Sequence, residues 1–380
     1  MSGGAERFPR ITPEALAELQ SRIGSEFSGP EPYITEANVD AIRHFADGVG
    51  DRNPLWRDPK YAAKTRWGTV LAPPTILFAF DRVLSGYIGG MPGIHAMYAG
   101  TDFRWRRPVR LGDKLKARPV LSTVREMKSQ FSAVSVLQSY TVPFRDQHGE
   151  LVCEAESWVI RTQRDEARRR TESGTSTHSF EPSTWTPEQI EEIAAAYRAE
   201  RPRGSEPRFW EDVKVGDALD ERLKGPATVT SFIAWDLGWG GLYIKAHGVA
   251  QAMFDDHPAL GIFNDQGVPE PPERVHWSNE MAKAVGVPGA YDYGPERISW
   301  LAHLVTDWMG DDAELRRLNV QVRKHNIVGD LTRCNGKVLR TWRKGGDHLV
   351  ECEVYGVNQR GERNCQGVAV VALPSRTVGS

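Results

Sequence analysis

Two short segments, far apart in the chain, hold side chains that could move protons. In the first, Asp51 and Asn53 stand in a Gly-Asp-x-Asn-Pro loop, and Trp56 follows shortly after them. In the second, His276 is a candidate base, and Asp292 lies in a turn further along. Carboxyl and imidazole side chains are common general acids and bases. The residue types therefore predict acid/base chemistry, with Asp51, Asn53, His276 and Asp292 as candidate catalytic residues.

The turn around Asp292 leads into an apolar helical pattern over residues 295–309. The N-terminus of a helix carries unpaired amides and a partial positive charge, which suits an oxygen that is or becomes negatively charged. We therefore expect the substrate to lie against this turn and the start of the helix. The candidate substrate-binding residues are Trp56, Gly289, Tyr291, Tyr293 and Gly294.

Each of these side chains also has a structural interpretation. Asp51 and Asp292 precede predicted helices, where an Asp often caps the first turn. Asn53 before a proline is typical of a turn, and Trp56 is a large side chain suited to fill a pocket. The sequence leaves both interpretations open at each position.

The elements that must position these segments fall into two similar halves. Each half has a helical pattern followed by β-rich runs that flank a Gly turn, as in a hairpin. A curved antiparallel sheet can bury one face against a long helix, and two such units can cover each other's edges. Two unrelated α+β domains are the alternative. The predicted helices cover residues 74–84 and 295–309, and the predicted hairpin strands cover residues 135–144, 151–161, 348–357 and 365–373.

A connector separates the two halves. A charge run at residues 164–170 is followed by a Thr-, Ser- and Gly-rich stretch, and then by Thr186 and Pro187. Thr at the N-cap and Pro at the first position start a helix, which we expect to end near Glu200. The predicted domains are residues 1–165 and 208–380, with the connector at residues 166–207.

The motif around Asp51 and the segment around His276 resemble the MaoC-like family of R-specific enoyl-CoA hydratases and acyl dehydratases. The resemblance covers most of residues 30–165 and 208–373. It implies an α+β fold of tandem hot-dog domains, each a long central helix wrapped by a curved antiparallel sheet, paired as a pseudo-dimeric double hot-dog. The resembling segments are residues 45–62, 68–74, 209–217, 276–282 and 287–294.

The resemblance also implies a reaction. The family adds water to a 2-enoyl thioester, or removes it from a 3-hydroxyacyl thioester, and an Asp and a His share the proton transfers. The substrate would be an acyl-CoA or a carrier-bound acyl group, so CoA or phosphopantetheine enters with the substrate and no separate cofactor is expected. The basic cluster at residues 104–110 is a candidate contact for the 3′-phosphate of CoA.

Neither half carries the complete family set. Trp56 stands where the family has its His, and residues 271–275 lack the Asp and Asn expected before His276, while Ser278 replaces the second Asp of the motif. Either His276 works with a distant carboxylate, or Asp51 and Asn53 work without a His. Otherwise the chain binds acyl thioesters without this chemistry, or is a hot-dog thioesterase. The distant carboxylates considered are Asp292, Asp265 and Asp236.

Composition and charge narrow the classes of partner and the cellular location that we expect. A formal net charge of −2 gives no reason to expect nucleic acid or an anionic membrane as a partner, and no apolar run is long enough for a membrane span. The four cysteines form no CxxC pair, so we expect reduced thiols and a cytoplasmic protein, with a Cys352–Cys365 disulfide as the alternative. Residues 255–257 lack partner ligands, so no metal is expected. The sequence does not decide whether the chain forms a homodimer or a higher oligomer.

Overall fold

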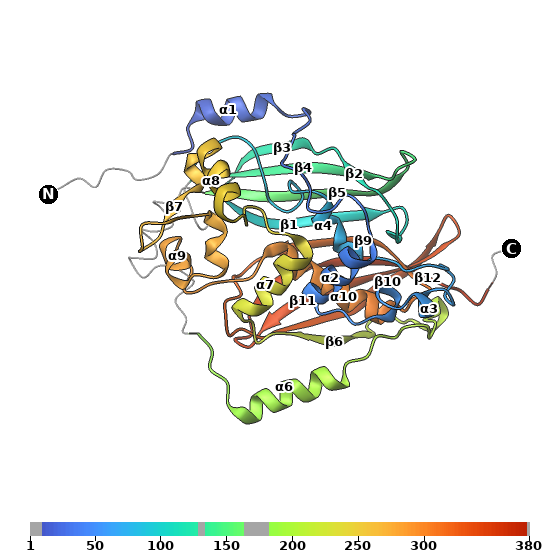
Figure 1. Cartoon of the computed structure of the whole chain (residues 1–380). Helices are drawn as coiled ribbons and strands as arrows, with labels where there is room; N and C mark the ends of the chain where they lie inside the picture. The colour runs from blue at the N-terminus through green and yellow to red at the C-terminus, as the bar shows by residue number, and fades with distance from the viewer. Residues whose placement is uncertain (1–9, 128–133, 163–181, 378–380) are drawn as a thin grey trace.

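Strands form the centre of the molecule, in a single ten-stranded sheet (Figure 1). The computed structural model describes residues 10–127, 134–162 and 182–377. The strand order is β2-β4-β5-β1-β9-β12-β11-β10-β6, and β3 pairs with β4. The first half supplies β1 (His95–Trp105), β2 (Lys116–Ala117), β3 (Val120–Met127), β4 (Ser135–Arg145) and β5 (Leu151–Thr162). The second half supplies β6 (Ala218–Lys224), β9 (Glu314–Val322), β10 (Thr332–Lys344), β11 (Asp347–Asn358) and β12 (Arg363–Leu373).

The halves join where β1 and β9 pair antiparallel, with Gly100 opposite Gln321 and Arg104 opposite Arg317. Two arginines that face each other across a ladder would repel. Asp102 lies between them and accepts hydrogen bonds from both guanidinium groups. One buried carboxylate therefore bridges the two guanidinium groups and offsets part of their repulsion, and the two sheets continue as one.

A central helix in the second half is buried along almost its whole length. This helix, α10 (Gly294–Met309), has no exposed residue from Pro295 to Met309. The sheet and both halves enclose it, as a hot-dog domain requires. The predicted helix over residues 295–309 and the predicted α+β double hot-dog are confirmed.

The matching helix of the first half is shorter than predicted. The expected helix over residues 74–84 is a 3-10 turn, η2 (Pro74–Ile76), followed by α4 (Leu77–Phe80). Asp81 adopts extended backbone angles and its carboxylate accepts the amide of Leu84. An Asp side chain that bonds nearby amides competes with the helical ladder, so the helix ends here. The chain then forms turns and a loop up to β1.

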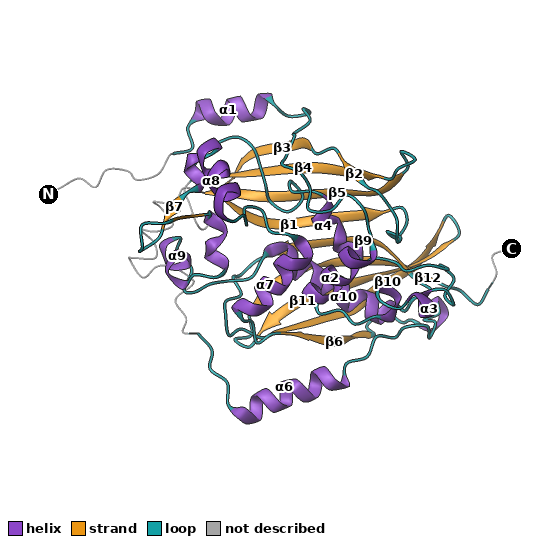
Figure 2. Cartoon of the chain, viewed as in Figure 1, coloured by secondary structure: helices purple, strands orange, loops and turns teal. Residues whose placement is uncertain are grey.

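The hairpins and the connector helix agree with their predicted positions. β4 and β5 flank the turn at Asp146, and β11 and β12 flank the turn at Asn358. In the connector, α6 (Pro187–Ala199) starts with Thr186 as its N-cap and a capping box to Gln189. The charge run at residues 164–170 lies outside the described residues. Figure 2 shows α6 at the β6 edge of the sheet and α1 (Pro13–Ser21) near β3 at the opposite edge.

The remaining helices and 3-10 turns are divided between the two halves. In the first half they are α2 (Val39–Val49), η1 (Pro54–Trp56) and α3 (Pro59–Ala62). In the second half they are η3 (Trp210–Asp212), α7 (Val229–Trp239), α8 (His247–Asp256), η4 (Pro258–Leu260), η5 (Pro272–His276) and α9 (Asn279–Ala284). The segment between α7 and η5 is an insertion, and it holds a small hairpin of β7 (Ile262–Phe263) and β8 (Pro269–Glu270).

All four cysteines are buried free thiols, as expected. Cys352 faces Ala369 across the ladder, and Cys365 faces Gly356, so the alternative disulfide does not form. Within the described ranges, no helix combines the length and the apolar character that crossing a membrane requires.

Two glycines let α2 and α7 cross at close range. A Cβ on Gly48 would lie 2.8 Å from the carbonyl oxygen of Ala234, and a Cβ on Gly238 would lie 2.6 Å from that of His44. Because both obstacles are backbone atoms, neither side can yield without moving a helix. The contact between the two halves on this side depends on these glycines.

We therefore expect Gly238→Ala to lower the free energy of unfolding by about 1–3 kcal/mol, through overpacking. Gly248→Ala is the matched control, since a Cβ on this α8 glycine meets open space. That control should be neutral or stabilising by up to about 1 kcal/mol. Urea denaturation measures both, and equal effects would contradict the close crossing.

Candidate active site

A cavity of about 600 Å³ lies between the two halves. This volume is within the range of small-molecule sites. The first half contributes the loop before β1, the start of β1 and the end of β5, and their side chains are mostly apolar. The second half contributes the insertion, η5 and the first turn of α10. The cavity therefore has an apolar wall on one side and the candidate catalytic segment on the other.

His276 lines this cavity at the end of η5. Its Nδ1 lies 2.7 Å from the carbonyl oxygen of Tyr291. A carbonyl can only accept, so Nδ1 carries the proton of the neutral ring and donates it there. Nε2 is left as an acceptor, and it has no hydrogen-bond partner among the described residues. The ring is thus held in one tautomer, with its basic nitrogen available in the cavity.

The surroundings of His276 keep it neutral. Burial lowers the pKa of the imidazole to about 4, and the positive charge of Arg297 acts in the same direction. The ring also stacks on Tyr293, with centroids 3.7 Å apart, and meets the edge of Tyr291 at 4.8 Å. A neutral, fixed imidazole can accept a proton, and its conjugate acid would give that proton up readily.

Asp292 lies in the cavity wall but does not contact His276. Its carboxylate pairs with Arg297, whose Nη2 is 2.7 Å away, and it also accepts from Asn326 at 3.2 Å. Burial raises the pKa of Asp292 to about 6, against the opposing effect of Arg297. Within the described chain, no carboxylate oxygen lies within 4.0 Å of the His276 ring nitrogens. The expected contact between His276 and Asp292 is wrong, because Arg297, one turn into α10, takes that carboxylate.

A different carboxyl pair lies beside the stacked tyrosine. The hydroxyl of Tyr293 donates to Asp236 at 3.1 Å. Burial, and then the nearby charge of Glu273, raise the pKa of Asp236 to about 8. Asp236, one of the distant carboxylates considered, therefore acts on the Tyr293 that packs against His276. Asp265, the other alternative, lies in the exposed turn between β7 and β8.

Glu273 is the cavity residue that the motif comparison missed. It lies three positions before His276, where the family motif has Asn, and it lines the same cavity. Its carboxylate accepts the amides of Leu242 and Tyr243, at 2.9 and 2.7 Å. Burial raises the pKa of Glu273 above its ordinary value. The spacing of Glu273 from His276 matches that of the motif Asn, so it could have identified Glu273. The motif comparison did not, because Glu is an acid with a longer side chain than the Asn amide.

The first turn of α10 completes this side of the cavity. Gly294 and Pro295 line it, and the ring of Tyr98 packs so closely on Gly294 that a side chain there would clash. Tyr291 and Tyr293 also line the cavity, as predicted. Gly289 is not among the lining residues; it lies in the turn where Asn279 accepts the amide of Ala290.

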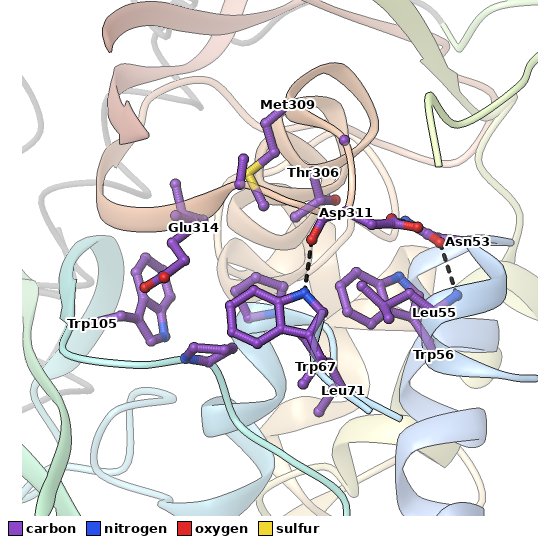
Figure 3. A pocket seen from close by; sticks show the side chains of 16 residues that line it. Asn53, Leu55, Trp56, Trp67, Leu71, Trp105, Thr306, Met309, Asp311 and Glu314 are labelled. Carbon is purple, nitrogen blue, oxygen red and sulfur yellow. Dashed lines mark hydrogen bonds between the residues drawn. The ribbon is translucent and has the colours of Figure 1, made fainter. Parts of the chain in front are cut away.

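The first-half motif lies elsewhere and is closed. Asp51 and Asn53 are 1% and 2% exposed, and the indole of Trp56 donates to Asp51 at 2.9 Å. Asn53 accepts the amide of Leu55 (Figure 3) and donates to Asp311. The pocket beside them holds only about 40 Å³. Trp56 therefore fills the place of a catalytic His, and its expected role in the substrate cavity is wrong.

Behind Asp51 lies a buried ionic cluster at the middle of α10. Asp51, His303 and Asp307 place possible ligand atoms within 4.8 Å of one another. However, Lys224 Nζ lies 2.7 Å from His303 Nδ1, and Arg222 pairs with Asp307 at 2.6 Å. Two cations already neutralise the carboxylates, so the donor set does not suit a metal ion. The cluster is a structural network that joins α10 to both halves.

The backbone around His276 repeats the order of elements found in the first-half motif around Asp51. Ser278 caps α9 as Asp58 caps α3, and both helices follow a short 3-10 turn. Ser278 thus keeps the structural role of the Asp that it replaces. In the basic cluster at residues 104–110, Arg104 pairs with Asp102, and Arg107 pairs with Asp113 and Asp146. None of these residues is part of the cavity wall.

Comparisons with known proteins agree with this architecture. Residues 21–155 match the family model described as FAS1-like, dehydratase domain region. A UPF0336 protein of Streptomyces avermitilis is 35% identical over 119 residues, which cover 30% of this chain and 76% of that protein. A probable enoyl-CoA hydratase alpha subunit of Thermomonospora curvata is 25% identical over 173 residues, covering 40% of this chain and 53% of that protein.

A solved structure described as a MaoC-like dehydratase superimposes on 94% of this chain and 100% of its own, with a TM-score of 0.64 and 20% identity. At this identity the match shows the fold alone. It extends over both halves, including the second half that the family model does not reach.

The closed first-half motif makes a prediction for stability. Trp56→Phe keeps the packing but leaves a buried oxygen of Asp51 without its donor, so we expect a loss of about 1–3 kcal/mol in the free energy of unfolding. Trp342→Phe, at a less buried tryptophan of β10, is the matched control and should change it by less than about 0.5 kcal/mol. Chemical denaturation measures both. A Trp56→Phe protein as stable as wild type would show that Trp56 does not hold Asp51.

Proposed function

We propose that this chain, which belongs to the MaoC-like family of hot-dog dehydratases, is a hydratase or dehydratase that acts on an acyl thioester in the cavity at His276. The observation that carries the proposal is the fixed tautomer of His276 in the wall of a cavity that the first turn of α10 also lines. The name of the Thermomonospora relative, a probable enoyl-CoA hydratase subunit, supports the same substrate class.

The proton transfers can be written with His276 alone. In hydration, water bound at Nε2 loses a proton to the imidazole as its oxygen forms the bond to the β-carbon. The electrons of the double bond move toward the thioester carbonyl, whose oxygen gains negative charge near the α10 N-terminus. The imidazolium then returns the proton to the α-carbon on the same face, and dehydration follows these steps in reverse.

Burial lowers the pKa of His276 to about 4, so its imidazolium form is more acidic than an ordinary one and would pass its proton to carbon readily. The same shift makes the neutral ring a weaker base, so proton transfer from water has to accompany formation of the bond between the water oxygen and the β-carbon. The carboxyl groups of Glu273 and Asp236 are positioned around Tyr293 and the insertion rather than at the ring nitrogens. We assign them to holding the site in shape. The catalytic residue of the proposal is His276.

This proposal divides the work between the halves. The second half supplies the base and the helix terminus, while the first half supplies most of the apolar wall for the acyl group. The buried Asp51–Trp56 pair supports a structural role for the first-half motif. A protein that binds the acyl thioester without turnover is the second candidate, and the incomplete motif in each half favours it.

His276→Asn is the informative substitution. Asn can still donate a side-chain N–H toward the Tyr291 carbonyl but lacks Nε2, so the fold should persist while hydration of a 2-enoyl-CoA falls by about 10²–10⁴-fold in kcat. His348→Gln, at a histidine that packs on Trp210 away from the cavity, is the control and should keep wild-type turnover.

The same assay separates the alternatives. Unchanged hydration in His276→Asn would remove His276 as the base. Tight binding of acyl-CoA by wild type, with no turnover of enoyl or 3-hydroxyacyl thioesters, would establish the binding protein. Release of free thiol, followed with a thiol-reactive dye, would establish a thioesterase.

Histidine ¹⁵N NMR tests the state of the base directly. We expect His276 to be the Nδ1–H tautomer at neutral pH, because the Tyr291 carbonyl can only accept. As the pH falls, we expect it to stay neutral until about 4, since burial lowers its pKa. The His276→Asn spectrum assigns the signal. An Nε2–H tautomer would contradict the proposed base, whereas titration near the ordinary pKa of about 6.5 would contradict the burial of His276.

A further inference from the structure

Six lysine and arginine side chains are buried in the described part of the chain, and five of them have a carboxylate nearby. Arg222 pairs with Asp307, Arg274 with Glu270, and Arg297 with Asp292. Lys224 lies within the electrostatic range of Glu200, Asp51 and Asp307, and Arg82 within that of Glu273 and Asp81. The sixth is Arg161, and its charged neighbours include no carboxylate.

Arg161 lies at the end of β5, is 4% exposed, and lines the cavity. Its Nε donates to Gln138 at 3.0 Å, and its Nη atoms donate to the carbonyl oxygens of Gly89, Gly90 and Ile94 at 2.7–3.1 Å. These contacts use four of the five N–H groups of a guanidinium, and one on Nη1 is left over. Neutral carbonyl and amide dipoles satisfy the hydrogen bonds, but they supply no negative charge.

A buried cation without a counter-ion is costly, and proteins usually pair it. Burial lowers the pKa of Arg161 to about 10, so the guanidinium nevertheless stays charged at neutral pH. The nearest titratable groups are the phenols of Tyr140 and Tyr243, which are neutral. The positive charge at this end of the cavity is therefore uncompensated within the described chain.

Tyr243 offers a second donor beside it. Its backbone amide is fixed by Glu273 at 2.7 Å, and its ring packs on Tyr87 with centroids 5.9 Å apart. Its side chain lines the cavity within the electrostatic range of Arg161. The phenol hydroxyl has no hydrogen-bond partner among the described residues. A rigid tyrosine thus connects the segment of His276 with the end of the cavity that Arg161 occupies.

We propose that the cavity binds an anionic oxygen group against Arg161 and the hydroxyl of Tyr243, so that the substrate is an acyl thioester with a second, negatively charged group. This inference rests on the proposed function, because the same cavity holds the thioester at His276. The anion has two possible sources, a carboxylate at the far end of the acyl chain or a phosphate of the CoA or carrier arm. Arg161 is deep in the wall, whereas Arg323, another cation of the lining, is exposed. This placement favours the acyl carboxylate at Arg161.

Gln138→Glu tests the missing counter-ion. The side chains have nearly the same shape, and one oxygen of the new carboxylate would lie where the amide oxygen now accepts from Arg161 Nε. The other oxygen would replace the Nε2 that donates to Gly89 and Tyr140, and Gln138→Met, which also loses these donations, corrects for that loss. We expect the new carboxylate to neutralise Arg161 and weaken binding of the anionic ligand by about tenfold or more. Gln138→Met is the matched control, because it removes the amide contacts without adding charge. Circular dichroism checks that both variants are folded.

Four ligands distinguish the sources of the anion. They are the trans-2-hexenoyl and the terminally carboxylated trans-2-hexenedioyl thioesters, each made on N-acetylcysteamine and on CoA, with binding measured by calorimetry. N-acetylcysteamine carries no phosphate. If wild type and Gln138→Met prefer the carboxylated acyl group on N-acetylcysteamine, and Gln138→Glu does not, the anion is the acyl carboxylate. If only the preference for CoA is lost, the anion is a phosphate.

The inference is overturned if Gln138→Glu is folded and binds all four ligands as wild type does; Arg161 then serves only to hold the loop before β1. Tyr243→Phe removes a single hydroxyl and gives a second test, in which a loss of about threefold or more is expected for the anionic ligands alone. Equal binding of every ligand by this variant also counts against the site. If binding depends on the anion but no thioester is turned over, the proposed function is wrong and the anion site is still supported.

Discussion

The enclosure of α10 is the constraint on which the rest of the structure depends. This helix is buried along almost its whole length although it carries Glu296, Arg297, His303 and Asp307. Ionisable groups in such a place need partners, because desolvation is costly. Arg297 therefore binds Asp292 near one end, and His303 and Asp307 form the cluster with Asp51, Lys224 and Arg222 further along. Both motif segments are thus fixed against one helix, one beside an open cavity and one in packed interior.

The unequal lengths of the two central helices place the cavity. α10 has sixteen residues, whereas α4 has four and ends at Asp81. The chain that would extend α4 instead forms turns and the loop before β1, and this segment supplies Ser85, Ile88 and Met91 to the cavity wall. The buried hydroxyl of Ser85 also accepts from the indole of Trp239, which ties the loop to α7. A short helix in one half therefore gives the other half room for a ligand.

Local patterns were sufficient to predict much of the fold. Gly turns between β-rich runs located both hairpins, and the Thr-Pro cap located α6, because these signals act over a few residues. The length of α4 was mispredicted, since the competing bond from Asp81 to Leu84 depends on a conformation that a hydrophobic pattern does not show. The motif predicted a cleft with His276 at the start of α10, but it did not predict the stacking of His276 on Tyr293 or the partner of Asp292. That partner, Arg297, lies inside a predicted helix. The sequence did not show whether its side chain faces the interior or the solvent.

The charges around the cavity act together on the base and on the substrate. Asp292 is neutralised by Arg297, and Glu273 lies within the electrostatic range of Arg82, so Arg161 leaves a net positive charge in the wall. A positive field disfavours a second cation, and Arg297 indeed contributes to the lowered pKa of His276. The same field favours a negative charge that develops during reaction, such as that on the thioester oxygen. The chemistry that we propose needs no carboxylate beside the base. A neutral imidazole in a positively charged, largely apolar cavity is therefore consistent with it.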